Sequence, residues 1–376
     1  MKKVLIVNNN LDMGGIQKSL INLLKEIHGE YDITLMLFSR SGSLLNEVPT
    51  DVNVITPCKL YSILGLSKEE LKKNPLFFGI KALMIKYASL FSRRSAMKVL
   101  GFFQKKITGY DVIISYSHLP NHKYFANGCG DFVLDQTICK KKICLIHCDY
   151  LHSGYMSDEN NREYSEFDGI ACCSDSVKSR FIQGSGIVSD KAYTLRNFFD
   201  LGVDKLAGND PYCYDKHFIN LVSVARLSSE KGIDRAIEAL QNCKRSDIRY
   251  YIIGGGPQMG DLEEMVSRYK MDSQVFFVGE QHNPYRYMVN ADYLLVPSLH
   301  EAAPMVFDEA NVLGLKIIST DTTSAVEMIG DNGIICNNSL EGIESALSSL
   351  TKSIKETSPS KTNQLQKKQF LELIGK

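Results

Sequence analysis

The sequence predicts an α/β protein made of two Rossmann-like domains. Its length of 376 residues favours two domains over one. Short apolar runs of the buried-strand type alternate with segments of helical spacing, which is typical of mainly parallel sheets. This alternation stops in residues 197–215, which hold two clusters of Pro, Gly, Asn and Asp, and it restarts at Ile219. We therefore expect an N-terminal domain over residues 1–200 and a C-terminal domain over residues 201–360.

The first domain is expected to begin with a strand, a glycine turn and a helix. Residues 4–7 form a continuous apolar run, Gly14 and Gly15 follow a polar loop, and helical spacing starts at Ile16. In a doubly wound sheet the ligand lies beyond the carboxyl end of such a strand. A plain tight turn would also explain a pair of glycines. Further strands are predicted at residues 33–38, 52–55, 112–115, 143–147, 170–173 and 192–195.

Residues 71–110 of the first domain contain nine cations and no acidic residue. Aromatic and aliphatic residues are interleaved with these cations. Such a mixture on helices suits an anionic membrane surface, where each Lys or Arg adds about 1 kcal/mol of attraction. The alternative is a pair of helices with apolar faces in the core and cations in water. We predict membrane docking by this segment, whose cations are Lys72, Lys73, Lys81, Lys86, Arg93, Arg94, Lys98, Lys105 and Lys106.

The overall charge and the cysteines indicate which partners and which cellular compartment to expect. The 43 Lys and Arg balance the 43 Asp and Glu, so we expect no nucleic-acid partner. The ten cysteines form no C-x-x-C pair and no framework, as in a reducing compartment. The first apolar run is too short for a signal peptide, and no uncharged apolar span reaches 18 residues. The predicted location is the cytoplasm, with a peripheral position on the inner face of the cell membrane.

Histidines and cysteines near the strand at residues 143–147 are candidate site residues. Cys144, His147 and Cys148 could be imagined as metal ligands, but strand alternation would direct them to opposite faces of the sheet. We therefore predict no metal site. At the end of the strand, the His147 imidazole can donate to a sugar hydroxyl, although a capping or core histidine is the alternative. His118 and His122 follow another strand end and are weaker candidates.

Two cations follow the first strand of the second domain, residues 219–225. Arg226 and Lys231 lie in the loop before the next helix, and such a loop can direct both side chains at one point. A diphosphate is the diagnostic partner for a pair of this kind, although two loop cations are more often solvated. The strand at residues 250–253 is followed by a glycine-rich turn, Gly254-Gly255-Gly256-Pro257.

Two acids flank the start of a later helix. Glu301 follows a strand, and Glu309 lies in a helical pattern that begins after a short turn. Residues 303–306 form a candidate cradle for an anion because a helix start offers N–H groups, and the small side chains of Ala302 and Ala303 would let a ligand approach the backbone. The two acids would then hydrogen-bond hydroxyl groups of a sugar and a ribose. The alternative is that Glu301 caps the helix and Glu309 is solvated.

The order of Arg and Lys, glycine-rich turn, and two Glu separated by seven residues resembles the retaining glycosyltransferases of family 4, which have the GT-B fold. The resemblance is thinner in the N-terminal half. The chain departs from it at Ala302-Ala303-Pro304, where the family usually has Gly-Phe-Gly, and at Asn197-Phe198-Phe199-Asp200, where it usually has Asn-Gly-Val-Asp. The resemblance implies two Rossmann-like domains facing each other across a cleft. It also implies a last helix, residues 361–376, that packs back on the N-terminal domain.

The resemblance further implies roles for individual residues. It assigns Arg226 and Lys231 to the diphosphate, Glu309 to the ribose, and Glu301 with His147 to the sugar. The catalytic residues would be His147, Glu301, Arg226 and Lys231. No enzymatic nucleophile is implied, because the leaving phosphate helps to take the acceptor's proton. The donor is also implied to contact Gly14, Gly15, Gly254, Gly256, Ala303, Pro304, Met305 and Val306.

The expected function is therefore that of a retaining hexosyltransferase. It would move a hexose from a nucleotide diphosphate sugar, with UDP as the expected nucleotide, to a glycan or lipid-linked acceptor in cell-surface polysaccharide biosynthesis. The chain has no D-x-D sequence, which disfavours the metal-dependent class, so we expect no metal and no further cofactor. Two alternatives stay open: a nucleotide-sugar epimerase of GT-B fold, and a noncatalytic subunit that binds sugar nucleotides.

Overall fold

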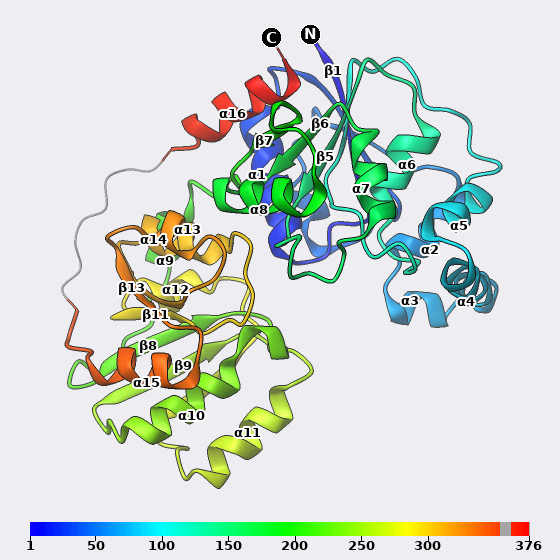
Figure 1. Ribbon diagram of the computed structural model, residues 1–376. Helices are drawn as coiled ribbons and strands as arrows, with labels where there is room; N and C mark the ends of the chain where they lie inside the picture. The colour runs from blue at the N-terminus through cyan, green and yellow to red at the C-terminus, as the bar shows by residue number, and fades with distance from the viewer. Residues whose placement is uncertain (354–361, 376) are drawn as a thin grey trace. The chain divides into compact units, whose positions relative to one another are not determined.

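The computed structural model describes residues 1–353 and 362–375. The chain forms two compact units, shown in Figure 1. Unit 1 comprises Met1–Phe199 and Asn363–Lys376, and unit 2 comprises Asp200–Thr362. Each unit has its own parallel sheet and its own hydrophobic core. The prediction of two Rossmann-like α/β domains is confirmed.

The sheet of unit 1 has seven parallel strands among the described residues, in the order β3-β2-β1-β4-β5-β6-β7. The strands at its centre are continuous apolar runs because both of their faces are buried, as in all-parallel sheets generally. The bounds are β1 Lys3–Asn8, β2 Asp32–Leu37, β3 Asn53–Ile55, β4 Val112–Ser115, β5 Lys141–Ile146, β6 Gly169–Cys172 and β7 Ala192–Thr194.

The helices of unit 1 include the last helix of the chain. Phe370 and Leu373 of that helix share one core with Leu20 and Leu24 of the first helix and with the central strands. The α-helices are α1 Gly15–Ile27, α2 Ser62–Gly65, α3 Lys68–Lys72, α4 Pro75–Leu90, α5 Arg93–Leu100, α6 Cys129–Gln136, α7 Asp158–Ser165, α8 Asp175–Ser185 and α16 Gln364–Ile374. The 3-10 helices are η1 Ser43–Glu47, η2 Lys59–Tyr61 and η3 Ser189–Lys191.

The sheet of unit 2 has six parallel strands among the described residues, in the order β10-β9-β8-β11-β12-β13. The strands are β8 Ile219–Val224, β9 Ile248–Ile253, β10 Val275–Gly279, β11 Tyr293–Val296, β12 Lys316–Thr320 and β13 Gly333–Cys336. The helices are α9 Val203–Gly208, η4 Ser229–Lys231, α10 Ile233–Cys243, α11 Met259–Arg268, α12 Tyr285–Met288, α13 Met305–Val312, α14 Ala325–Ile329 and α15 Leu340–Ser348.

Both sheets reverse their strand order beside their first strand, between β1 and β4 in unit 1 and between β8 and β11 in unit 2. Open α/β sheets bind ligands at such a point, beyond the carboxyl ends of the strands. Gly14 follows β1, Arg226 and Lys231 follow β8, and Glu301 follows β11. The topology therefore puts the predicted site residues at the ligand-binding edges of the two sheets.

No helix within residues 1–353 and 362–375 is both long enough and apolar enough to cross a membrane.

Candidate functional site

The loops after β8 and β11 meet at the carboxyl edge of the unit 2 sheet. The backbone N–H of Leu299 donates to the carbonyl of Glu230 at 2.9 Å, which joins the two loops directly. The Lys231 ammonium donates to Oε1 of Glu301 at 2.5 Å, and both side chains are mostly buried. The Ser298 hydroxyl donates to the same carboxylate oxygen at 3.2 Å. The structure thus brings Lys231 and Glu301 into direct contact.

Arg226 lies in the same loop and is paired with another carboxylate. Its Nη2 donates to Oε1 of Glu230 at 2.8 Å, and the Ser228 hydroxyl donates to that oxygen at 2.6 Å. Burial alone would raise the pKa of Glu230, but the hydrogen bonds from Ser228 and Arg226 outweigh it and lower this pKa to about 2. The Arg226 side chain is 71% exposed, so its guanidinium is accessible to a ligand.

The glycine-rich turn after β9 packs against the loop that carries Arg226. A Cβ on Gly254, which has φ +143°, would lie 1.9 Å from the carbonyl oxygen of Ala225. A Cβ on Gly256 would lie 2.3 Å from the carbonyl oxygen of Leu227. The N–H of Leu227 also donates to the carbonyl of Gly255 at 2.8 Å. These glycines therefore allow two backbones to approach each other, a contact that sequence reasoning had not identified.

The helix α13 begins beside Glu301. Pro304 precedes it with an extended backbone, so the N–H groups of residues 305 and 306 lie in its first turn, as the sequence predicts. Glu309 is buried in this helix and accepts a hydrogen bond from the Tyr285 hydroxyl at 3.0 Å. Burial rules out the alternative that Glu309 is a solvated residue. Glu301 accepts hydrogen bonds from Lys231 and Ser298. No side chain within the described residues caps the start of α13, so the alternative that Glu301 caps this helix does not hold.

His147 lies one residue beyond β5, at the carboxyl edge of the unit 1 sheet. Its Nε2 is buried and has no hydrogen-bond partner in the part of the chain that the structure describes. Burial, with a smaller contribution from neighbouring His118, lowers the pKa of His147 to about 3. Burial also lowers the pKa of His118 to about 4, and its ring stacks on Tyr155 with centroids 5.2 Å apart. Both imidazoles are therefore neutral at physiological pH.

Gly14 and Gly15 lie where β1 leads into α1. Gly14 immediately precedes the helix with an extended backbone, and Gly15 is its first residue. A Cβ on Gly15 would meet no atom within 4 Å, whereas a Cβ on Gly14 would meet the flexible side chain of Gln17. Close packing of the protein therefore does not require a glycine at position 15.

The site residues that sequence reasoning missed are mostly polar partners of predicted ones. Glu230 and Ser228 hold Arg226, Ser298 contacts Glu301, and Tyr285 contacts Glu309. Glu230 could have been found, because it stands beside Lys231 and four residues after Arg226. Tyr285 lies in α12, 24 residues before its partner, and only the tertiary structure brings the two together.

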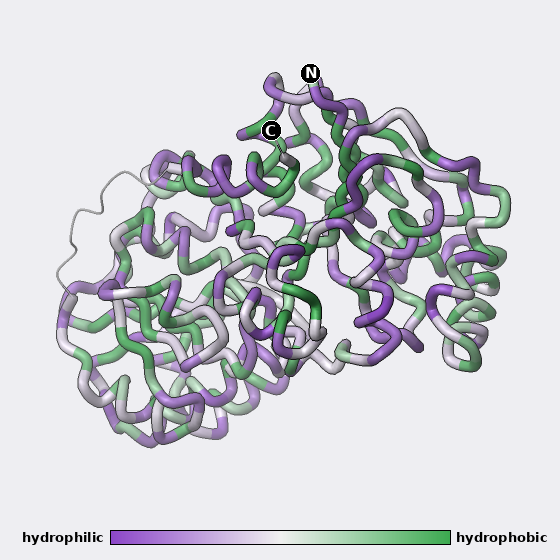
Figure 2. Tube along the Cα trace, turned by 45° about the horizontal axis from the view of Figure 1, so that its top comes forward, coloured by the Kyte–Doolittle hydropathy of each residue, from purple (hydrophilic) through white to green (hydrophobic). Residues whose placement is uncertain are grey.

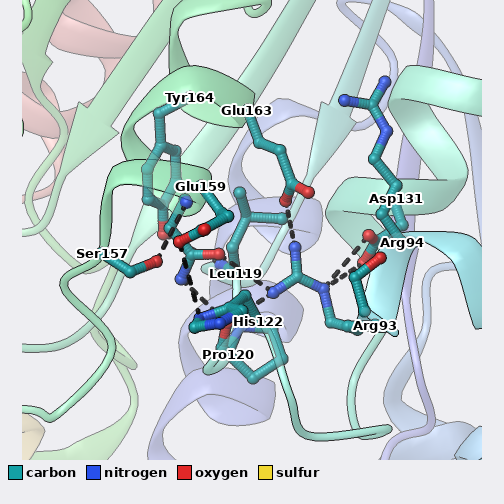
Figure 3. A network of polar contacts seen from close by, with 12 residues as sticks. Arg93, Arg94, Leu119, Pro120, His122, Asp131, Ser157, Glu159, Glu163 and Tyr164 are labelled. Carbon is teal, nitrogen blue, oxygen red and sulfur yellow. Dashed lines mark hydrogen bonds and ion pairs between the residues drawn. The ribbon is translucent and has the colours of Figure 1, made fainter. Parts of the chain in front are cut away.

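The nine cations of residues 71–110 are not all available at the surface, because Arg93 and Arg94 are paired with acidic residues of other elements. Arg93 is fully buried, and Figure 3 shows the polar contacts that surround its guanidinium. Its Nε donates to Asp131 of α6 at 2.9 Å, and its Nη2 contacts Glu163 of α7. Its Nη1 donates to the carbonyl of Pro120 at 2.5 Å. Residues 71–110 contain no acidic residue, and the acidic partners of Arg93 come from α6 and α7, which lie later in the chain.

Arg94 is likewise held by acids from other elements. It donates to both carboxylate oxygens of Asp135 and also contacts Glu166. Lys106 donates to the backbone carbonyl of Asp135. These contacts leave Lys72, Lys73, Lys86 and Lys105 as exposed cations of the segment for which no ion pair is recorded within the described residues.

No three His, Cys, Asp or Glu side chains within residues 1–353 and 362–375 are grouped so that they could hold a metal ion. Cys144 and His147 accordingly belong to no such group within these residues.

Residues 215–366 match the family described as Glycosyl transferases group 1. The gpi3 subunit of the phosphatidylinositol N-acetylglucosaminyltransferase of Schizosaccharomyces pombe is 35% identical over 124 residues, which are 32% of this chain and 27% of that protein. One subunit of the phosphatidylinositol N-acetylglucosaminyltransferase of Arabidopsis thaliana is 25% identical over 61% of this chain and 54% of that protein. The chain thus spans about a quarter and about half of the length of these two relatives.

A bacterial relative matches over more of its length. The N-acetylgalactosamine-N,N'-diacetylbacillosaminyl-diphospho-undecaprenol 4-alpha-N-acetylgalactosaminyltransferase of Campylobacter jejuni is 23% identical over 88% of this chain and 84% of that protein. Among solved structures, Anabaena HepE in complex with UDP-glucose aligns over 98% of this chain and 94% of its own, with a TM-score of 0.62 and 17% identity. TarM of Staphylococcus aureus aligns over 100% and 99%, with a TM-score of 0.70 and 12% identity. At these identities the structures show the fold, which is GT-B.

Proposed function

We propose that the protein is a retaining glycosyltransferase that transfers a hexose from a UDP-sugar to a glycan or lipid-linked acceptor in cell-surface polysaccharide biosynthesis. The observation that carries the proposal is the contact between Lys231, after β8, and Glu301, after β11, with Arg226 in the same loop. The family match of residues 215–366 and relatives named for glycosyl transfer support it. HepE, with the same fold, binds UDP and UDP-glucose.

In this proposal the two cations bind the diphosphate of the donor. Each has a carboxylate partner in the protein, and a diphosphate would take the place of that partner or share the cation with it. Negative charge grows on the phosphate oxygen as its bond to the anomeric carbon breaks. Arg226, Lys231 and the N–H groups of Met305 and Val306 at the start of α13 would stabilise this charge without a metal.

The acceptor hydroxyl would attack the anomeric carbon from the face that the phosphate leaves, so that the configuration is retained. A bond from the acceptor oxygen to the carbon forms, the bond from the carbon to the phosphate oxygen breaks, and the acceptor's proton passes to the departing phosphate. Glu301 would accept hydrogen bonds from hydroxyls of the hexose, and Glu309 from the ribose. His147, which is neutral because its pKa is low, would donate to a hexose hydroxyl.

The acceptor is proposed to be glycan or lipid-linked because the Campylobacter jejuni relative is named for transfer to a diphospho-undecaprenol glycan. The corresponding location would be the cytoplasm, with a peripheral position on the inner face of the cell membrane. Such a location would let the protein reach an acceptor anchored in the bilayer.

A thermal-shift panel of UDP, GDP, ADP and their sugars tests the donor part of this proposal. A ligand that binds only the native state raises the melting temperature with its concentration. We expect UDP and UDP-hexoses to raise it and the other nucleotides to have little effect. No shift with any nucleotide would contradict the proposal. Slow release of UDP from a UDP-hexose by the lone protein would exclude the noncatalytic subunit, and recovery of an epimeric UDP-sugar would favour the epimerase.

A further inference from the structure

The helix α4 is apolar on all sides, yet little of it is buried. Its sequence, PLFFGIKALMIKYASL, contains two lysines and no acid. Of its 16 residues, all of which the structure describes, Phe77 and Ala88 are the buried ones. Helices that are hydrophobic all round normally lie in a protein core or in a membrane. Most of the apolar surface of α4 is therefore not covered by any described part of the chain.

The exposed apolar residues form two lines along the outward half of the helix. Leu76, Leu83 and Leu90 follow one another at intervals of seven residues and so lie along one line of the helix. They are 68%, 64% and 66% exposed. Phe78 and Ile85 form a second exposed line on the opposite edge of the outward half of the helix, because residues two apart lie about 200° apart around the axis, and Lys86 lies between the two lines. Hydrophobic colouring marks much of this helix in Figure 2.

The cations left exposed by the structure lie around this face. Lys72 and Lys73 precede α4, and Lys86 lies on it. Phe91 continues the apolar surface directly after the helix and is 61% exposed. We call Lys72, Lys73, Leu76, Phe78, Leu83, Ile85, Lys86, Leu90 and Phe91 the α4 surface.

We propose that the α4 surface docks on an anionic lipid bilayer. Leu and Phe side chains of this kind enter the boundary between headgroups and acyl chains, while Lys side chains contact anionic headgroups. A second copy of the chain fits less well, because the α4 surface holds three lysines and no acidic residue, so a two-fold interface would bury like charges from both copies without a partner. The complementary charge selects the lipid surface.

The buried Arg93 fixes the α4 surface to the rest of unit 1. Arg93 begins α5, directly after α4, and bonds to α6, to α7 and to the Pro120 carbonyl. Lys123 donates to the carbonyl of Phe91 at 2.8 Å. Residues 120–123 follow β4 and His118, so a bilayer bound to α4 would be held at a set position relative to the carboxyl edge of this sheet. The docking site thus deepens the proposed function, since it would present a lipid-linked acceptor at that edge.

Vesicle flotation of the full chain tests the proposal. We expect the protein to float with vesicles of phosphatidylcholine and phosphatidylglycerol at low salt, to bind pure phosphatidylcholine vesicles much less, and to be released as salt rises. The triple variant Leu76→Ser, Leu83→Ser, Leu90→Ser removes the apolar line, and the triple variant Lys72→Glu, Lys73→Glu, Lys86→Glu reverses the charge. Each is expected to weaken binding to the mixed vesicles by at least about tenfold.

Matched controls change the same chemistry elsewhere. Ile138→Ser with Val188→Ser removes apolar residues that are each 61% exposed in unit 1, and Lys205→Glu with Lys216→Glu reverses exposed cations of unit 2. Both controls should bind vesicles like the wild type. Equal binding by the α4 variants and the wild type, or no wild-type binding at low salt, would overturn the proposal. So would a stable wild-type dimer that the leucine variant converts to monomers.

The same preparations separate this proposal from the proposed function. Thermal shift with UDP should be unchanged in both α4 variants, because unit 2 carries the residues proposed for the nucleotide. Vesicle binding without any nucleotide shift would retain the docking surface and contradict the transferase. A nucleotide shift without vesicle binding would do the reverse.

Discussion

Each cation of the candidate site in unit 2 is paired with a carboxylate of the protein. Lys231 contacts Glu301, and Arg226 contacts Glu230. Each carboxylate thus offsets the charge of the cation that it contacts. The two cations differ in environment, because Lys231 is mostly buried whereas Arg226 is largely exposed. Their contributions to ligand binding should differ accordingly.

Replacing Lys231 with Ala should weaken UDP binding and lower kcat/KM for a UDP-hexose. A charge-assisted contact in a mostly desolvated site contributes about 2–4 kcal/mol. Arg226→Ala should act in the same direction with a smaller effect, because water already solvates its guanidinium. Isothermal titration calorimetry with UDP measures both. Lys216→Ala, an exposed lysine outside the site, is the control, and unchanged affinity in both site variants would refute the assignment.

Two imidazoles of unit 1, each partly buried with one ring nitrogen fully covered, make stability depend on pH. The pKa of His118 is lowered to about 4 and that of His147 to about 3, whereas both would titrate near 6.5 in the unfolded chain. A lowered histidine pKa means that the unfolded state binds more protons below pH 6.5. Stability should therefore be fully present above about pH 6.5 and fall as the pH drops from 6.5 to 4, by up to about 1.4 kcal/mol per pH unit for each residue.

Urea denaturation at a series of pH values checks this dependence. The double variant His118→Asn with His147→Asn should flatten the decline between pH 6.5 and 4. His217→Asn, at a side chain 92% exposed, should leave the decline as it is. An equally steep decline in the double variant would show that other groups cause it.

The buried ion network around Arg93 should be essential for the stability of unit 1. Arg93→Met would leave the carboxylates of Asp131 and Glu163 buried without their partner. Breaking a buried pair in this way costs about 3–5 kcal/mol. Chemical denaturation measures the loss, with Arg162→Ala, at a side chain 74% exposed, as the control. A loss below about 1 kcal/mol would mean that water enters the network and solvates the acids.

At the scale of elements, loops and helix ends determine where the charged groups lie. The loop after β8 is held on one side by the glycine-rich turn after β9 and on the other by the loop after β11. The guanidinium of Arg226 is largely exposed and contacts Glu230 of its own loop. Its position therefore depends on the backbone contacts that hold this loop in place.

Gly254→Ala should displace the loop that carries Arg226. The new Cβ would overlap the carbonyl oxygen of Ala225, and φ +143° is unfavourable for alanine. We expect weaker UDP binding and a loss of stability of about 1–3 kcal/mol. Gly260→Ala is the matched control, since a Cβ there meets no atom within 4 Å and lies in helix α11. UDP affinity equal to that of the wild type in Gly254→Ala would show that the loop accommodates the methyl group.

At the scale of the whole molecule, two sheets of similar topology carry different chemistry at their carboxyl edges. The carboxyl edge of the unit 2 sheet carries cations paired with acids. The carboxyl edge of the unit 1 sheet carries neutral imidazoles and the glycines at the start of α1. In the proposed function, unit 2 binds the anionic donor. In the same proposal, unit 1 contacts neutral hydroxyl groups, and it also carries the α4 surface.

The transfer reaction should not need a metal. The prediction follows from the missing D-x-D sequence and from the two cations available for the leaving phosphate. UDP release from a UDP-hexose should be the same in EDTA as without it, and added Mg²⁺ or Mn²⁺ should not raise it. Loss of activity in EDTA that either ion restores would contradict the prediction.

Much of the site could be predicted from the sequence, because a loop that follows a buried strand can be recognised from the neighbouring residues alone. Arg226, Lys231 and Glu301 each follow an apolar run closely, so the topology of an α/β sheet brings them to one edge. Their partners could not be predicted in this way. Tyr285 meets Glu309 across two helices, and the glycine turn meets the Arg226 loop through backbone atoms that carry no sequence signal.

The sequence by itself determined the two Rossmann-like domains, because the periods of buried strands and helices are properties of neighbouring residues. Only the tertiary structure decided which of the cations in residues 71–110 are free. Arg93 and Lys86 look alike in sequence, yet acids of α6 and α7 bury the first and leave the second exposed. Burial depends on contacts between segments 38 and 70 residues apart, and local periodicity carries no information about them.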